Sequence, residues 1–255
     1  ETHTIFYELV TENFRKQIVD QYKAYCRVCE KKNLKQVISL GMSPLANGLL
    51  KNINEKDVLY PLELNYCPNC SNCQLSFTVP AQKMFDDYLY VSSTNQTFRN
   101  HFLNTAEKLI KEFKLNKESF ILDIGSNDGV FLHPLKEKGI KILGVDPAEN
   151  LVNLANSKGL ESIHGYFDEK IANKVIKSKG KADIVTAFNV FAHADDLRSL
   201  AMNAFKVLKE DGVFIIEVQY LLDTLKDVTF DNIYHEHVNY WSVTSLKKFC
   251  ELNNL

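Results

Sequence analysis

The sequence predicts an α/β fold in which a doubly wound parallel sheet follows a small, cysteine-rich N-terminal lobe. Three observations lead to this prediction. From Ser119 onward short apolar runs alternate with amphipathic helical segments, two Cys-x-x-Cys pairs precede them, and a glycine-containing turn directly follows the first apolar run. Continuous runs of Ile, Val, Leu and Phe joined by helices are typical of buried parallel strands with right-handed crossovers.

The composition is that of a folded protein with one or two domains. Of 255 residues, 45% are hydrophobic and 11% are aromatic, which is enough to bury a core and excludes a disordered chain. The 30 Lys and Arg residues are balanced by 32 Asp and Glu residues. We therefore expect no nucleic-acid partner. No apolar run approaches the roughly 20 residues that span a bilayer, so no membrane association is expected.

The periodicity of the chain predicts four parts. Residues 1–25 show helical spacing and are predicted to form an N-terminal arm, and residues 26–80 hold both Cys-x-x-Cys pairs. Residues 81–115 read as a linker and a helix, with apolar residues on one face from 98 to 113. Residues 116–255 carry the alternating strands and helices, with strands expected at 120–123, 141–145, 184–188 and 213–218.

The cysteine spacing predicts a structural zinc site. Cys26 with Cys29 and Cys67 with Cys70 each place two thiols on one side of a tight turn, and two such turns complete the tetrahedral shell that Zn²⁺ prefers. Disulfides are the alternative. Zinc is favoured because the rest of the chain reads as a cytoplasmic enzyme, whose compartment keeps thiols reduced. Four thiolates leave no open coordination position, so the zinc is expected to be structural, and Cys73 is expected to pack as a small apolar residue.

The turn after the first predicted strand favours S-adenosylmethionine as the cofactor. Gly125 permits a tight turn and Gly129 a close approach, and Asp146, at the end of the next strand, can accept hydrogen bonds from both ribose hydroxyls. A dinucleotide site is expected to show Gly-x-Gly-x-x-Gly, whereas this chain has Asp-x-Gly-x-x-x-Gly. The predicted cofactor-binding residues are Asp123, Gly125, Ser126, Asn127, Gly129, Asp146, Pro147 and Asn189.

Several motifs together resemble one family. They lie at residues 26–29, 40–47, 60–62, 67–75, 85–90, 122–129, 189–193 and 234–237. Over roughly residues 24–255 the chain resembles the sugar C-methyltransferases, which act on nucleotide-activated keto-deoxysugars, typically at C3 of a thymidine-diphosphate 4-keto-6-deoxy sugar. The resemblance implies a Rossmann-like class I methyltransferase sheet, a nucleotide-sugar substrate and a further C-terminal domain. We therefore expect the chain to be part of a longer enzyme.

The chemistry of carbon methylation suits the cluster at residues 234–237. Methylating a carbon next to a ketone requires a base at the C–H and a donor beside the developing oxyanion. Histidine, tyrosine and a carboxylate supply a base, a hydrogen-bond donor and an orienting group. In an extended segment, Tyr234 and Glu236 are expected to face one way and His235 and His237 the other.

The resemblance assigns roles to these residues. It implies that His237 is the leading base, that Glu236 orients it or contacts the sugar, and that Tyr234 lies near the ketone. It also implies that His193, which follows the strand at 184–188, assists, and that Tyr88 covers the site from the linker.

Other functions stay open at this point. An O-methyltransferase acting on a sugar also needs a base, and zinc lobes occur beside this fold in RNA methyltransferases. The balanced charge argues against RNA, and the Asn/Asp-Pro-Pro-aromatic motif of amino-methylating enzymes is replaced by Phe188-Asn189-Val190-Phe191. A non-catalytic binding protein is the third class, although Tyr88, His193 and His237 are all present. Metal binding by His235 and His237, with His193 as a third ligand, is the alternative for the cluster.

Overall fold

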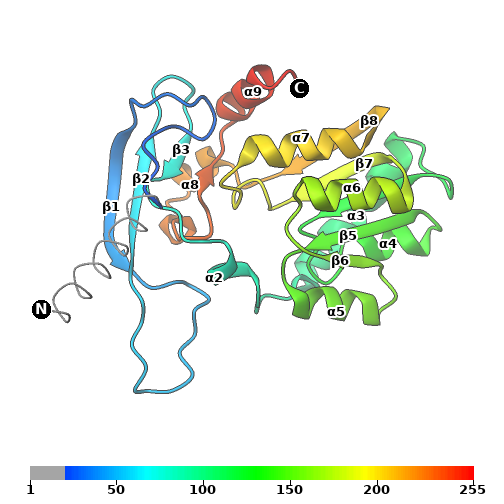
Figure 1. Cartoon of the computed structure of the whole chain (residues 1–255), viewed down its shortest axis with the longest axis horizontal. Helices are drawn as coiled ribbons and strands as arrows, with labels where there is room; N and C mark the ends of the chain where they lie inside the picture. The colour runs from blue at the N-terminus through cyan, green and yellow to red at the C-terminus, as the bar shows by residue number, and fades with distance from the viewer. Residues whose placement is uncertain (1–20) are drawn as a thin grey trace, which may run out of the picture. The chain divides into compact units, whose positions relative to one another are not determined.

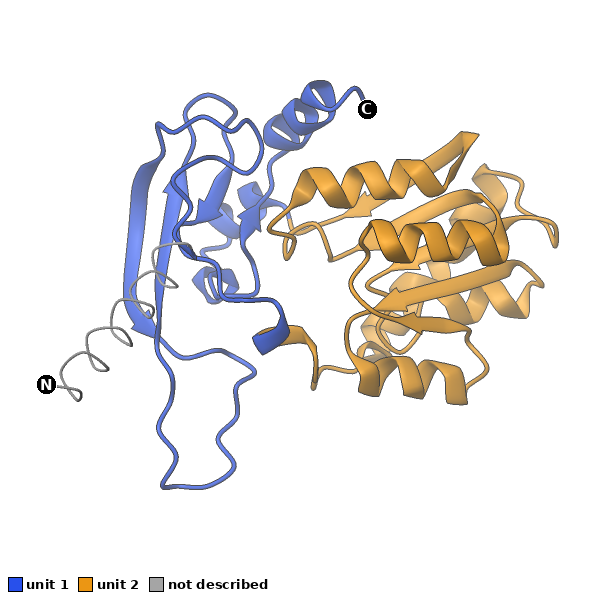
Figure 2. Ribbon diagram, in the orientation of Figure 1, with its two compact units in different colours: residues 1–83, 220–255 blue, residues 84–219 orange. Residues whose placement is uncertain are grey.

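The computed structural model describes residues 21–255, which form two compact units. Unit 1 comprises residues Glu1–Lys83 and Tyr220–Leu255, and unit 2 comprises Met84–Gln219 (Figure 2). Most of the predicted N-terminal arm, residues 1–20, lies outside the described residues. The units divide the chain differently from the predicted domains, because residues 220–255 group with the cysteine-rich lobe and not with the rest of the predicted 116–255 domain.

Unit 2 contains the predicted parallel sheet (Figure 1). The described part of this sheet has five strands in the order β6-β5-β4-β7-β8, and every neighbouring pair is parallel. Its strands are β4 (Phe120–Ile124), β5 (Lys141–Asp146), β6 (Ser162–His164), β7 (Ala182–Phe188) and β8 (Leu208–Glu217). The four predicted strands are confirmed, and β6 was not predicted because only three residues form it.

Helices join the strands of unit 2 and supply its core. They are α3 (Gln96–Glu112), α4 (Leu132–Glu137), α5 (Glu149–Ser157), α6 (Glu169–Lys179) and α7 (Leu197–Val207). The predicted helix at 98–113 is confirmed as α3, which begins where the Asn95 side chain accepts hydrogen bonds from two free backbone amides. Phe102 of α3 stacks on Phe188 of β7 at a centroid distance of 5.6 Å, and this contact joins helix to sheet.

Unit 1 contains an antiparallel sheet in the order β1-β2-β3-β9. Its strands are β1 (Lys35–Ser43), β2 (Tyr60–Tyr66), β3 (Cys73–Leu75) and β9 (Asn239–Tyr240). The motif at residues 40–47 starts within β1. Gly41, at φ 75°, lies where the register shifts between Ser39 and Met42, and this bulge lets the strand continue.

Pairing of β3 with β9 explains why residues 220–255 belong to unit 1. Cys73 is paired with Tyr240 and Gln74 with Asn239, and the apolar side chains of Leu64, Leu75 and Tyr240 share one buried cluster. The remaining helices among residues 21–255 are α2 (Gln82–Phe85), η1 (Ser92–Thr94), α8 (Leu221–Lys226), η2 (Phe230–Asn232) and α9 (Val243–Leu252).

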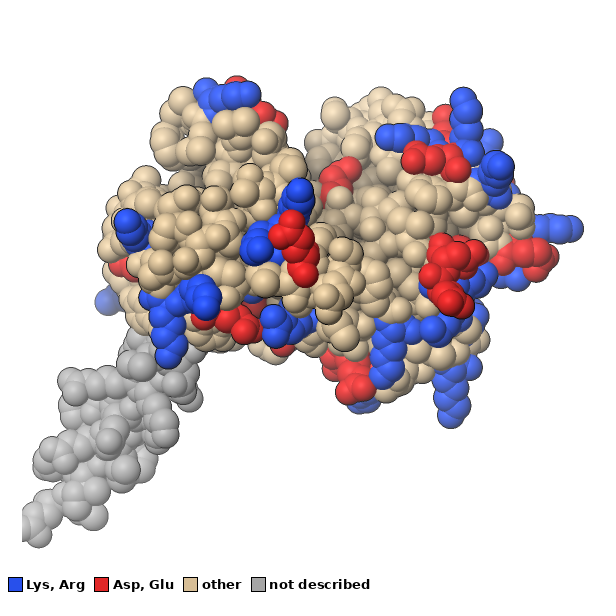
Figure 3. Space-filling view, turned by 90° about the horizontal axis from the view of Figure 1, so that it is seen from above, with Lys and Arg blue, Asp and Glu red and all other residues tan. Residues whose placement is uncertain are grey.

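The surface carries charges of both signs. On the face shown in Figure 3, Lys and Arg side chains are interspersed with Asp and Glu side chains. Among residues 21–255 no helix has both the length and the apolar character that crossing a membrane requires.

Candidate active site and zinc site

The two Cys-x-x-Cys pairs form the same backbone turn. The N–H of Glu30 donates to the carbonyl of Cys26 at 2.8 Å, and the N–H of Ser71 donates to that of Cys67 at 2.9 Å. In both turns the N–H of the first cysteine also donates to the carbonyl five residues later, at 2.9 and 2.8 Å. Glu30 and Ser71, which each follow a second cysteine, have φ values of 60° and 58°. The repeated turn therefore presents each pair of sulfur atoms in the same way.

The four sulfur atoms of Cys26, Cys29, Cys67 and Cys70 lie within 4.8 Å of one another. The closest separations, Cys26 to Cys70 and Cys29 to Cys67, are 3.5 Å, and all four are free cysteines. A tetrahedral zinc ion with Zn–S bonds of about 2.3 Å needs sulfur separations of about 3.8 Å, whereas a disulfide needs about 2.05 Å. The arrangement fits zinc with four thiolate ligands, which is a structural site. A hydrogen bond from the Cys70 thiol lowers the pKa of Cys26 to about 5.

The zinc site is linked by one short strand to the predicted catalytic cluster. β3 begins at Cys73, three residues after Cys70, and the N–H of Leu75 donates to the carbonyl of Val238 at 3.0 Å. Val238 directly follows His237. Cys73 itself belongs to the apolar core of unit 1, as predicted. β3 therefore connects the zinc site to the segment that carries His237.

Residues 234–237 form a turn, and the predicted alternation of their side chains is wrong. The N–H of His237 donates to the carbonyl of Tyr234 at 3.1 Å, so the chain reverses within four residues. The rings of Tyr234 and His237 consequently lie side by side, with centroids 4.2 Å apart. The turn brings a candidate base and a candidate proton donor together.

The hydrogen bonds of His237 define its tautomer. Nδ1 lies 2.9 Å from the carbonyl oxygen of Asn232, and because a carbonyl only accepts, Nδ1 carries the proton. Nε2 then holds a lone pair, to which the Tyr234 hydroxyl donates at 3.1 Å. His237 is 4% exposed, and burial lowers its pKa below the ordinary 6.5. Burial and the nearby charge of Glu236 raise the pKa of Tyr234, so the phenol stays protonated.

Glu236 and His235 have other partners. The Glu236 carboxylate, in a residue that is 3% exposed, accepts a hydrogen bond of 2.6 Å from the side chain of Asn47. We expected a carboxylate to orient His237, but the acceptor found at Nδ1 is the Asn232 carbonyl. His235 is buried with its ring 5.9 Å from that of Tyr60 and its Nε2 3.4 Å from the Tyr60 carbonyl. The two histidines therefore engage different carbonyls, which does not favour a shared metal.

In unit 2, Asp146 has the geometry of a ribose acceptor. It ends β5, and its two carboxylate oxygens accept hydrogen bonds from the backbone amides of Asn127 at 2.8 Å and Ala148 at 2.9 Å. Each oxygen has a second lone pair for a further donor. Burial raises the pKa of Asp146, and the two backbone hydrogen bonds act in the opposite direction. A buried carboxylate with one spare acceptor position on each oxygen fits the paired hydroxyls of S-adenosylmethionine.

Both glycines of the turn have conformations that a side chain disfavours. Gly125 has φ 68° and Gly129 has φ 81°. A Cβ at Gly125 would overlap Cγ2 of Val190, and one at Gly129 would lie 2.5 Å from Cδ1 of Leu160. The predicted geometric requirement for glycine at these two positions is confirmed.

Two predicted cofactor-binding side chains point into the interior of unit 2. Asp123 accepts a hydrogen bond of 2.6 Å from the Thr186 hydroxyl of the neighbouring strand, and burial raises its pKa to about 7. The hydroxyl of Ser126 occupies space that a Cβ at Gly144 would need. The carbonyl of Pro147 lies 2.9 Å from Nε2 of His164. Cofactor contacts of Asp123, Ser126 and Pro147 stay predictions.

An aromatic contact brings together His193 and Tyr88 in unit 2. The ring of Phe85 lies 5.6 Å from that of His193, at 90°, and 5.7 Å from that of Tyr88. Asn189 directly follows β7, has φ 58°, and donates its N–H to the carbonyl of Glu217 at 2.8 Å. Asn189 and His193 therefore lie in the segment after the carboxyl end of β7, at the edge where parallel sheets bind ligands.

Three residues of these groups were not predicted. Phe85 and Asn47 belong to motifs quoted above, yet their contacts with His193 and with Glu236 arise only from folding. Asn232 acts through its backbone carbonyl, which leaves no signal in the sequence.

Two family models match the chain. Residues 96–255 match the family described as "Methyltransferase domain" and residues 26–85 match the family described as "Putative zinc binding domain". The second match contains all four cysteines of the zinc site.

Individual methyltransferases are also similar to the chain. C-methyltransferase NovU of Streptomyces niveus is 32% identical over 232 residues, which cover 90% of this chain and 55% of NovU. A ubiquinone biosynthesis O-methyltransferase of Pelagibacter ubique is 26% identical over 142 residues, which cover 53% of this chain and 58% of that protein. The chain thus spans little more than half the length of these two relatives.

A solved structure supports the fold. The plantazolicin methyltransferase BpumL, in complex with SAH, aligns with a TM-score of 0.50 at 16% identity over 64% of this chain and 67% of BpumL. Because the methyltransferase model extends over more than half of the residues, the chain belongs to the methyltransferase domain family, with S-adenosylmethionine as its cofactor and a structural zinc site of four cysteines.

Proposed function

We propose that this protein transfers the methyl group of S-adenosylmethionine to a ring carbon of a nucleotide-activated keto-deoxysugar, at the carbon next to the ketone. The observation that carries the proposal is the turn at residues 234–237, where the unprotonated Nε2 of His237 lies beside the hydroxyl of Tyr234. Similarity to C-methyltransferase NovU and the motifs shared with sugar C-methyltransferases support it.

The reaction begins with removal of a proton from carbon. Nε2 of His237 takes the proton next to the ketone, and the C–H electron pair forms a carbon–carbon double bond while the carbonyl pair moves onto oxygen. The Tyr234 hydroxyl, which donates to Nε2 in the structure, turns away from Nε2 when the substrate binds and donates its hydrogen bond to the oxyanion that develops. The Asn232 carbonyl, which accepts from Nδ1, stabilises the imidazolium that results.

Transfer of the methyl group completes the reaction. Bound S-adenosylmethionine supplies an electrophilic methyl carbon on a sulfonium, and its by-product is S-adenosylhomocysteine. The enolate carbon forms the new C–C bond as the carbonyl is restored, and the proton on His237 is released to solvent. Asp146 holds the ribose, and the segment 189–193 lies after the carboxyl end of β7.

Burial prepares His237 for this role. A lowered pKa keeps the imidazole neutral at pH 7, so the base is present in its active form. The Glu236 carboxylate, which accepts a hydrogen bond from Asn47, is assigned to contact the sugar. His193 and Tyr88, which share Phe85 as a neighbour, are assigned an assisting role by the motifs shared with sugar C-methyltransferases.

The test is exchange of the proton next to the ketone. A thymidine-diphosphate 4-keto-6-deoxy sugar is incubated with the protein in heavy water without the methyl donor, and NMR follows the loss of that proton. The wild-type protein and His133→Ala, in which an exposed histidine is removed, are expected to catalyse exchange. His237→Ala is expected to slow it about 10²–10⁴-fold, the usual contribution of a general base. Exchange at the wild-type rate in His237→Ala contradicts the assignment.

Methylation of a sugar oxygen is the second candidate, because the methyltransferase part also resembles a ubiquinone biosynthesis O-methyltransferase. A histidine base serves both reactions. Only carbon methylation requires exchange at the carbon next to the ketone, so methyl transfer without any such exchange favours the oxygen.

A further inference from the structure

A segment without long regular structure carries Tyr88 and Tyr90 in unit 2. We call residues 86–93 the tyrosine strap. Its start is held by the Tyr166 hydroxyl, which donates to the Asp86 carboxylate at 2.8 Å. The side chain of Asn150 then donates to the carbonyl of Tyr88 at 2.9 Å. Tyr166 follows β6 and Asn150 lies in α5, which follows β5, so the strap runs along the cofactor edge of the sheet.

Asn127, in the glycine turn, binds the strap with both atoms of its carboxamide. Its Nδ2 donates to the carbonyl of Tyr90 at 3.0 Å, and its Oδ1 accepts from the N–H of Ser92 at 2.9 Å. The backbone N–H of the same residue donates to Asp146 at 2.8 Å. Asn127 therefore joins the strap directly to the predicted ribose acceptor.

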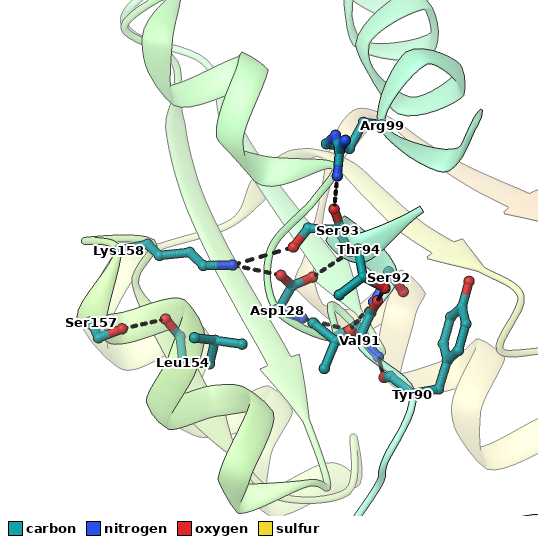
Figure 4. A network of polar contacts seen from close by, with 11 residues as sticks. Tyr90, Val91, Ser92, Ser93, Thr94, Arg99, Asp128, Leu154, Ser157 and Lys158 are labelled. Atoms are coloured by element: carbon teal, nitrogen blue, oxygen red, sulfur yellow. Dashed lines mark hydrogen bonds and ion pairs between the residues drawn. The ribbon is translucent and has the colours of Figure 1, made fainter. Parts of the chain in front are cut away.

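Asp128 adds an ion pair between its buried carboxylate and a partly exposed lysine at the same place. Its carboxylate, whose side chain is 0% exposed, accepts from Lys158 at 2.6 Å and from the N–H of Ser93 at 3.2 Å. Lys158 also donates to the hydroxyl of Ser93 at 3.4 Å. Figure 4 shows Asp128 between Lys158 and the end of the strap. A buried carboxylate keeps its position through such partners.

We propose that Asn127 and Asp128 are positioning residues that couple cofactor binding at Asp146 to the placement of Tyr88 beside Phe85, whose ring also contacts His193. This rests on the proposed function for the role of Tyr88 but not for the coupling itself. A cofactor that orders the turn stabilises the docked strap, and by linkage a docked strap strengthens cofactor binding. Asn127 binds the strap through its carboxamide, and its predicted contact with the cofactor stays a prediction.

Hydrogen exchange of residues 86–93, measured by mass spectrometry with and without S-adenosylhomocysteine, tests the coupling. In the wild-type protein the ligand is expected to increase protection of the strap. Asn127→Gly removes the carboxamide but keeps the left-handed backbone, since Asn127 has φ 51°. A typical hydrogen bond shifts an equilibrium about fivefold, so losing two lowers protection of the strap about 25-fold.

Further variants refine the test. Asn127→Asp keeps the acceptor for Ser92 and is expected to give intermediate protection. Lys158→Met breaks the pair with Asp128 and is expected to reduce the ligand-induced protection. Lys136→Met is the matched control, because Lys136 bonds to the carbonyl of Gly159 and not to the strap. Asn127→Gly is also expected to change two quantities relative to the wild-type protein. The fold decrease in turnover at saturating methyl donor is expected to exceed the fold decrease in cofactor affinity.

The outcomes are distinct. Unchanged ligand-induced protection in Asn127→Gly, or no such protection in the wild-type protein, overturns the proposal. If circular dichroism shows that Asn127→Gly does not fold, Lys158→Met serves as the test variant. Ligand-induced protection of the strap in Lys158→Met equal to that in Lys136→Met then overturns the proposal. The hydrogen-exchange experiment uses S-adenosylhomocysteine and no sugar. Failure to methylate a keto-sugar therefore counts against the proposed function and does not affect the test of the coupling.

Discussion

Replacing one zinc ligand tests whether the metal organises the predicted catalytic turn. Cys67 is fully buried, its sulfur lies 3.5 Å from that of Cys29, and its turn leads within six residues to β3. β3 in turn pairs with β9, which follows His237. The variant Cys67→Ser is therefore expected to release zinc and to loosen this pairing.

The size of the effect follows from the four-ligand shell. Structural zinc sites of this kind contribute an apparent ~10–16 kcal/mol, so one of four equivalent ligands represents about 2.5–4 kcal/mol, or roughly a 10²–10³-fold loss of zinc affinity. Such a loss is comparable with much of the stability of a small domain, which is about 5–15 kcal/mol.

The assay combines metal content with local protection. Zinc is measured by mass spectrometry after competition with a chelator, and hydrogen exchange is followed at β3 and at residues 234–240. Cys250→Ser is the matched control, because Cys250 is a free, half-buried cysteine on α9 outside the site. Full zinc retention in Cys67→Ser, or an equal loss in Cys250→Ser, refutes the reasoning.

Three further predictions concern the cofactor edge and the base. Asp146→Ala is expected to weaken S-adenosylmethionine binding by about 1.5–3 kcal/mol, the range for hydrogen bonds to a charged group. If calorimetry shows wild-type affinity in this variant, Asp146 is not the residue that binds the ribose. Gly125→Ala is expected to destabilise the protein by about 1–3 kcal/mol in urea unfolding, because φ is 68° and a Cβ there overlaps Val190; an unchanged midpoint argues against this strain. Burial lowers the pKa of His237, so the base loses its proton at lower pH than a free histidine, and the acid limb of the pH profile for proton exchange is expected below 6.5. A limb at or above that value contradicts the buried, neutral imidazole.

Local sequence patterns were sufficient for much of the fold. Four of the five described parallel strands contain continuous apolar runs. Three of them, β4, β5 and β7, are buried along almost their whole length, and strands buried on both faces are apolar throughout. The glycines at 125 and 129 were predictable because their backbone conformations exclude most other residues, and the zinc site because each pair of ligands lies within one turn. The three-residue strand β6 escaped prediction, since only one of its residues is buried.

Long-range contacts decided the chemistry. Asn47 and Glu236, which hydrogen-bond to each other, are 189 residues apart, and the tautomer of His237 depends on a backbone carbonyl whose direction no residue type reveals. The grouping of residues 220–255 with the cysteine-rich lobe likewise follows from pairing between β3 and β9. By itself the sequence determined which chemical groups are present and which local turns carry them. Only the tertiary structure decided which groups meet, because a hydrogen bond depends on the positions of two atoms in space and not on their separation along the chain.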